Sequence, residues 1–131
     1  MQIRIAAKAL AVILEQAERT FPEEACGLLL GVRQHITDAR PTANIASDRT
    51  RHFEIDPQTL VDAHRSARGG GAQVLGYYPS HPAGPAEPSA VDRARAAHDG
   101  AVWAIAGADD VTVWRDEEAG FVPRSYTVAD G

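Results

Sequence analysis

Residues 76–92 read Gly-Tyr-Tyr-Pro-Ser-His-Pro-Ala-Gly-Pro-Ala-Glu-Pro-Ser-Ala-Val-Asp and hold the densest group of potentially reactive side chains in the chain. Their apolar start is typical of a strand, and their proline- and glycine-rich middle is typical of a loop. Ser89 is a favourable helix N-cap, and Asp92 follows three positions later, so a helix is expected to begin there. The pattern predicts that Ser80, His81, Ser89 and Asp92 gather where a strand meets a helix.

The composition is that of an ordinary globular protein. The chain has 131 residues, of which 44% are hydrophobic and 24% charged, and this predicts one domain over residues 1–131. The formal net charge of −5 argues against general affinity for nucleic acid, because phosphates require a basic footprint. No apolar run approaches the ~20 residues of a membrane span, and no signal-peptide pattern is seen at the N-terminus. With the single cysteine Cys26 no internal disulfide can form, so we expect a cytoplasmic protein.

Hydrophobic periodicity predicts that strands and helices alternate along the chain. The order predicts an α+β, or mixed α/β, fold with a central mixed sheet flanked by helices. Three short apolar runs, at residues 25–32, 74–78 and 101–106, are expected to be adjacent central strands. The other expected strands are residues 2–6, 34–45 with a break at Pro41, 52–56, 111–115 and 121–128, and the expected helices are residues 7–20, 56–69 and 89–100.

The spacing around His81 suggests a metal site. Side chains alternate along a strand, so positions 79 and 81 face the same way. Two histidines there, with a carboxylate from the first turn of the next helix, would give the three protein ligands and open position of a catalytic zinc site. A glutamate from a neighbouring strand, such as Glu24, could then act as general base on the bound water. Position 79 is Pro79, however, so only His81 and Asp92 remain as ligands.

Each of these features also has an ordinary structural explanation. Ser89-x-x-Asp92 is close to a helix capping box, and a histidine beside a proline is commonly a loop residue. Glu24 follows a proline and a second glutamate and would fit a solvated turn. Cys26 in an apolar strand is most simply a core residue. As a nucleophile in another class of enzyme, Cys26 would need a base and an oxyanion donor, and no flanking motif supplies them.

Together, two separated motifs resemble the JAMM family, also called MPN or Mov34/PAD-1, and especially its short bacterial and archaeal members. The first motif, residues 22–31, is Pro-x-Glu-x-Cys-Gly-Leu-Leu-Leu-Gly. The second is Gly-x-Tyr-Pro-Ser-His-Pro at residues 76–82, then six residues, then Ser89-x-x-Asp92. The family pattern is an upstream glutamate, His-Ser/Thr-His-Pro, six residues and Ser-x-x-Asp. The resemblance covers roughly residues 3–115 and implies the family's layered fold, which is similar to that of cytidine deaminases.

The resemblance implies a zinc-dependent peptidase or isopeptidase. Its substrates would be the C-terminal tails of ubiquitin-like proteins or of bacterial sulfur-carrier proteins that end in Gly-Gly, which fits cytoplasmic sulfur chemistry. By position, Glu24 would be the general acid/base, His81 and Asp92 would be zinc ligands, and Ser89 would stabilise the oxyanion.

Pro79 departs from the family pattern, because it replaces the first histidine ligand and has no donor atom for zinc. The chain is then either a metallopeptidase with an altered zinc site or a catalytically inactive binding module without zinc, a type that the family contains. We expect the enzyme, since a domain long freed from catalysis would have lost several of the other site residues. Three histidines elsewhere in the chain could complete the shell: His52, His64 and His98.

Overall fold

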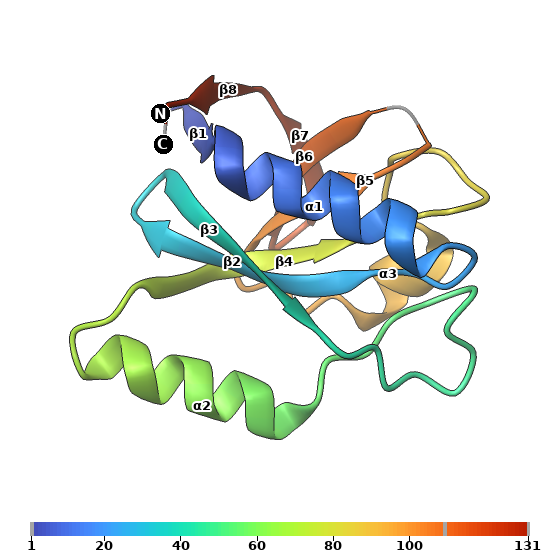
Figure 1. Cartoon of the computed structure of the whole chain (residues 1–131), viewed down its shortest axis with the longest axis horizontal. Coiled ribbons are helices and arrows are strands. Elements are labelled where there is room, and N and C mark those ends of the chain that lie inside the picture. The colour runs from blue at the N-terminus through green and yellow to red at the C-terminus, as the bar shows by residue number, and fades with distance from the viewer. Residues whose placement is uncertain (1, 109, 131) are drawn as a thin grey trace.

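A computed structural model describes residues 2–108 and 110–130 and shows a twisted mixed sheet with helices packed against it (Figure 1). The eight strands found in these residues form one sheet in the order β7-β6-β5-β4-β2-β3-β1-β8. This confirms the predicted mixed fold with a central sheet. The helices are α1 (Ala7–Thr20), α2 (Pro57–Arg68) and α3 (Ala90–Arg95), and the strands are β1 (Ile3–Ala6), β2 (Cys26–Val32), β3 (His35–Thr42), β4 (Gln73–Pro79), β5 (Val102–Ala106), β6 (Val111–Glu117), β7 (Gly120–Arg124) and β8 (Tyr126–Ala129).

The middle of the sheet is built from the three apolar runs, as predicted. Strand β2 pairs antiparallel with β4, and β4 pairs parallel with β5. Gly76 permits the second pairing, because a Cβ atom at this position would lie 1.6 Å from the carbonyl oxygen of Val102. A side chain there would force the two strands apart. The position of β4 matters for the candidate site, since the loop that carries His81 follows directly from its end.

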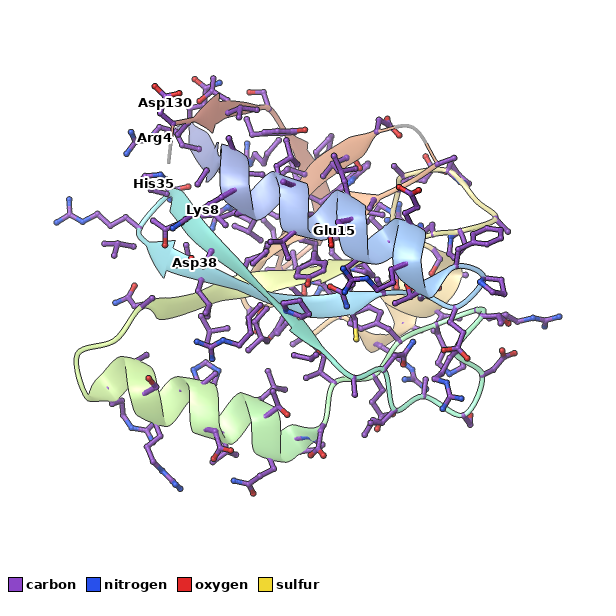
Figure 2. The ribbon with its side chains drawn as sticks, viewed as in Figure 1. Arg4, Lys8, Glu15, His35, Asp38 and Asp130 are labelled. Atoms are coloured by element: carbon purple, nitrogen blue, oxygen red, sulfur yellow. The ribbon has the colours of Figure 1, made fainter. Side chains whose placement is uncertain are left out.

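Helices cover both faces of the sheet, and α1 and α2 lie on opposite sides of it (Figure 1). Side chains alternate along β2, so Leu29 packs with Ile13 of α1, whereas Leu28 packs with Ala63 of α2. A surface ion pair between Lys8 of α1 and Asp38 of β3 spans 3.5 Å (Figure 2). Exposed pairs of this kind stabilise little, so apolar burial holds the layers together.

Two predicted strand features are wrong. Residues 52–56 form no strand; instead the Asn44 side chain accepts the Glu54 N–H and donates to the His52 carbonyl, so one side chain holds this segment. Pro41 does not break its strand but lies within β3 opposite Gly27. It is tolerated because β1 pairs only with the first residues of β3, which leaves an open edge at Pro41.

Two C-terminal boundaries also differ from the prediction. Helix α3 ends at Arg95 rather than continuing to Gly100, because the His98 N–H donates to the buried Asp116 carboxylate of β6 at 2.9 Å. The predicted strand 121–128 is two strands separated by one residue, Ser125: β7 pairs antiparallel with β6, whereas β8 pairs parallel with β1 at the other end of the strand order. No helix in the described part of the chain is long and apolar enough to cross a membrane.

Candidate active site

The four residues predicted from sequence lie together at one end of the central strands. Glu24 comes just before β2, His81 just after β4, and Ser89 and Asp92 begin α3. Glu24, His81 and Ser89 line one cavity of about 410 Å³, and Asp92 is hydrogen-bonded to His81 beside it. The structure therefore brings together the residues that the motif spacing selects, while their chemical roles stay predictions.

Hydrogen bonds beyond the strand ends fix the backbone of this region. The Ser80 N–H donates to the Ala25 carbonyl at 2.9 Å, and the Ser80 hydroxyl accepts the Ala25 N–H at 2.7 Å. On the other side, the His81 N–H donates to the Ala106 carbonyl at 2.8 Å. The chain segments carrying Glu24 and His81 are thus tied directly to each other, which sets the separation of the two side chains.

His81 is buried between two acceptors. Its Nδ1 lies 3.0 Å from the Pro85 carbonyl, and its Nε2 lies 3.0 Å from Asp92 Oδ2. A carbonyl can only accept a hydrogen bond, so Nδ1 carries a proton. Nε2 then meets the carboxylate in one of two ways: as a second N–H donor, or next to a bound cation. Burial alone would lower the pKa of His81, but the bonds to Asp92 and Pro85 outweigh it, so this pKa is raised. The site therefore favours positive charge at His81 Nε2.

Ser89 and Asp92 form a complete capping box. The Asp92 N–H donates to the Ser89 hydroxyl oxygen at 3.1 Å, and the Ser89 N–H donates to Asp92 Oδ2 at 3.0 Å. The helix-capping explanation of Ser89-x-x-Asp92 is thus confirmed, and it is compatible with the predicted functional roles of the two residues. The same Asp92 oxygen also contacts His81, so the start of α3 holds the imidazole in place.

Glu24 is a buried carboxyl that lacks a full set of partners. It is 5% exposed, and among the described residues its Oε1 has no hydrogen-bond partner. Burial raises the pKa of Glu24 from 4.5 to about 7, while the charge of His81 opposes the rise and that of Asp92 adds to it. Its backbone is fixed by the Asn44 side chain, which donates to the Glu24 carbonyl. Glu24 can thus exchange a proton near neutral pH, as a general base must.

His81 and Asp92 could supply two zinc ligands, one fewer than a catalytic shell needs. The bond from His81 Nδ1 to a backbone carbonyl is the arrangement that orients metal-binding imidazoles, and it leaves Nε2 directed at Asp92. Pro79 is buried opposite Cys26 and offers no donor. Within the described residues no group of three His, Cys, Asp or Glu side chains could hold a metal ion. His64 lines a cavity with the first residues of β4, and His98 contacts Asp116, so neither completes the shell.

The structure removes one alternative and adds residues that the sequence did not indicate. Cys26 is fully buried, and burial raises the pKa of its thiol, which disfavours a role as nucleophile. Thr50 and Arg51 line the same cavity as Glu24, although they belong to a polar loop without any motif. Only the tertiary fold brings them to the site, because they lie far in sequence from His81.

The known proteins similar to this chain agree with the motifs. Residues 6–117 match the family described as prokaryotic homologs of the JAB domain. A desampylase of Haloferax volcanii is 36% identical over 90 residues, which are 67% of this chain and 65% of the desampylase. The match thus spans just under two thirds of that relative's length.

Solved structures show the same architecture. The solution structure of a Desulfitobacterium hafniense protein has a TM-score of 0.87 and 27% identity, with 99% of this chain and 94% of that chain covered. A JAB1/MPN domain protein of Archaeoglobus fulgidus has a TM-score of 0.65 and 20% identity, with 97% of this chain and 100% of that chain covered. At this identity the similarity supports the fold alone. The chain belongs to the prokaryotic JAB family, within the JAMM/MPN domains that its two motifs indicate.

Proposed function

We propose that the protein is a JAB-type hydrolase that cuts a peptide or isopeptide bond at the C-terminal tail of a ubiquitin-like or sulfur-carrier protein. The observation that carries the proposal is Glu24, a buried carboxyl whose pKa is about 7 and which faces the cavity lined by His81 and Ser89. The similarity to a desampylase supports the reaction and the substrate class. In this role residues 1–131 would act as one cytoplasmic domain.

The side chains of the cavity can supply proton transfer and charge stabilisation. Glu24 would take a proton from the attacking water and return it to the leaving amine. The Ser89 hydroxyl oxygen already accepts the Asp92 N–H, so its own proton is free to be donated to the oxyanion of the tetrahedral intermediate.

His81 and Asp92 are the residues that would hold zinc. A zinc ion bound there would lower the pKa of a bound water and polarise the scissile carbonyl. Because Pro79 supplies no third ligand, we expect zinc affinity well below that of a three-ligand site. Hydrolysis by the unmodified chain should therefore depend on added zinc.

The cavity, of about 410 Å³, can receive a tail that ends in Gly-Gly. Glycine has no Cβ, so two glycines can approach a backbone closely where other residues would clash. The cavity is bounded by the loop after His81 on one side and by Thr50 and Arg51 on the other. Arg51, whose guanidinium lies 3.6 Å from the Asp48 carboxylate, is the cationic residue of this lining.

A second function, favoured by Pro79, is a binding module that holds the same tail without cutting it. The missing ligand and the lack of a three-donor group in the described residues both favour it. Such a module would retain the cavity and its hydrogen bonds but would bind no zinc.

Zinc titration of the wild-type chain and a His81→Ala variant separates the two functions. The hydrolase should bind about one zinc per chain, weakly, and His81→Ala should abolish this binding. Circular dichroism of both proteins controls for folding. If neither protein binds zinc while a peptide ending in Gly-Gly still binds the wild type, the hydrolase proposal fails and the binding module stands.

A further inference from the structure

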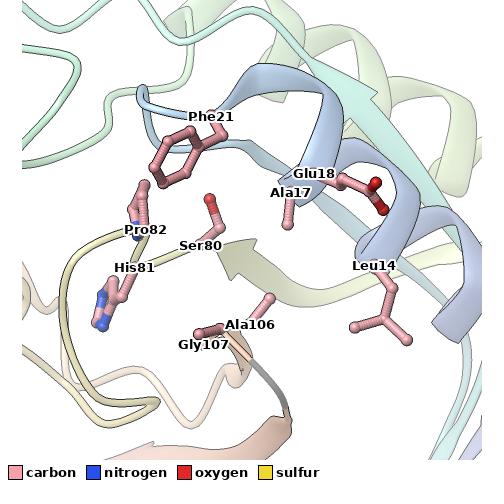
Figure 3. Close-up of a pocket in the computed structure, with 10 residues that line it drawn as sticks. Leu14, Ala17, Glu18, Phe21, Ser80, His81, Pro82, Ala106 and Gly107 are labelled. Carbon is pink, nitrogen blue, oxygen red and sulfur yellow. The ribbon is translucent and has the colours of Figure 1, made fainter.

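A second cavity, of about 480 Å³, lies on the α1 side of His81 (Figure 3). One wall is the face of α1 that carries Leu14 and Glu18, extended by Phe21 just after the helix. The opposite wall is the chain around His81 and Pro82. His81 and Pro82 line both this cavity and the one that contains Glu24, so the two cavities adjoin at these two residues.

Large apolar side chains are open to solvent at this cavity. Phe21 is 63% exposed and Leu14 is 43% exposed, and Figure 3 shows both among the side chains that line it. Exposed aromatic and aliphatic groups that gather in a concave surface beside a reactive site are typical of ligand binding. A ligand that covers them would remove apolar surface from water.

Glu18 gives this apolar wall a negative charge. Its side chain is exposed, and among the described residues it takes part in no ion pair, whereas Arg19 beside it is paired with Glu15. An apolar wall with one carboxylate complements a lysine or arginine side chain, which has an aliphatic stem and a cationic end. A free carboxylate would be repelled from the same place.

We propose that this cavity binds a lysine or arginine side chain of the substrate tail, at the residue that precedes Gly-Gly. The inference rests on the proposed function, since it places the tail across His81. An extended chain advances about 3.3 Å per residue, so that residue lies about 7–10 Å from the bond that is cut, in the adjoining cavity. The two glycines cannot fill this cavity themselves, because they have no side chains. The stem would contact Phe21 and Leu14, and the cation would pair with Glu18.

Three fluorescent peptides that differ at one residue test the proposal. They end in Lys-Gly-Gly, Leu-Gly-Gly and Asp-Gly-Gly, and their affinities are measured by anisotropy. The wild type should bind the lysine peptide about two- to five-fold more tightly than the leucine peptide, the range expected for an exposed ion pair, and the aspartate peptide least tightly. Glu18→Gln should remove this preference, and Phe21→Ala should weaken lysine and leucine peptides by about ten-fold.

Two matched variants control for general effects. Glu15→Gln removes the same charge one turn earlier on α1, and Val128→Ala shortens an exposed apolar side chain on β8. Both variants should bind the three peptides with the affinities of the wild type. Equal affinity for all three peptides, or tighter binding of the leucine peptide, would overturn this inference and leave tail binding intact. Failure of every peptide to bind would overturn the proposed function together with it.

Discussion

The unpartnered carboxyl of Glu24 should make the fold less stable whenever it is ionised. Because its pKa is raised from 4.5 to about 7, the folded state binds this proton more tightly than the unfolded chain does. The penalty is therefore absent below about pH 4.5, grows as the pH rises, and is complete above about pH 7. A tenfold change in proton affinity is about 1.4 kcal/mol, so the full penalty is about 3 kcal/mol. That is a large share of the ~5–15 kcal/mol that typically stabilises a domain.

The substitution Glu24→Gln keeps the shape of the side chain and removes its ionisation. At pH 8 the variant should be more stable than the wild type by about 2–3 kcal/mol, since the net rise in the pKa of Glu24 already includes the attraction to His81. At pH 5, where the folded wild type is mostly protonated, the gain should fall below about 1 kcal/mol. Urea unfolding at the two pH values, with a chelator present, measures both differences.

The control is Glu23→Gln, an exposed neighbour that pairs with Arg49 on the surface. It should change the free energy of unfolding by less than about 0.5 kcal/mol at either pH. A Glu24→Gln variant that is less stable than the wild type at pH 8, or whose effect does not depend on pH, would refute the description of Glu24 as a desolvated base. When the substitution of a buried residue raises the free energy of unfolding, the original residue is one retained for function rather than for stability.

Three other substitutions test the site and its support. Ser89→Ala should lower the free energy of unfolding by about 1 kcal/mol in urea, because it removes the cap from α3; no change would mean that the capping box contributes nothing. Gly76→Ala should prevent stable folding, since its Cβ would lie 1.6 Å from the Val102 carbonyl oxygen; a native circular dichroism melt would contradict this close approach. Pro79→His should raise zinc affinity at least ten-fold in chelator competition, because a second imidazole two residues before His81 would add a third ligand to His81 and Asp92; equal affinity would show that the loop presents no site.

The parts of the fold that the sequence predicts are those encoded locally. Asp56 and Pro57 start α2 as their types require, with the Asp56 carboxylate accepting the Gln58 N–H. The apolar run of β2 is buried and central, and the Ser89 box begins α3. In each case the signal lies within a few residues of the element that it determines.

The errors arise where a distant residue decides the outcome. Helix α3 ends early because Asp116 of β6 accepts the His98 N–H, and the strand pairing changes after Arg124 because β1, distant in sequence, offers a free edge to β8. Both contacts join residues that no local pattern links. For the same reason the sequence selects the four motif residues but not the contribution of Arg51 to their cavity, nor the raised pKa of Glu24, which depends on burial.

Cleavage of a tail-linked reporter by the wild-type chain tests the proposed hydrolase site most directly. The substrate is a sulfur-carrier protein whose C-terminal Gly-Gly is joined to a short reporter peptide, incubated with excess zinc and analysed by mass spectrometry. We expect a single cut after Gly-Gly that Glu24→Gln slows at least about 100-fold and Glu23→Gln leaves unchanged. The absence of any cut at all zinc concentrations, or an equal rate with Glu24→Gln, would contradict the assignment of this cleft as a hydrolytic site.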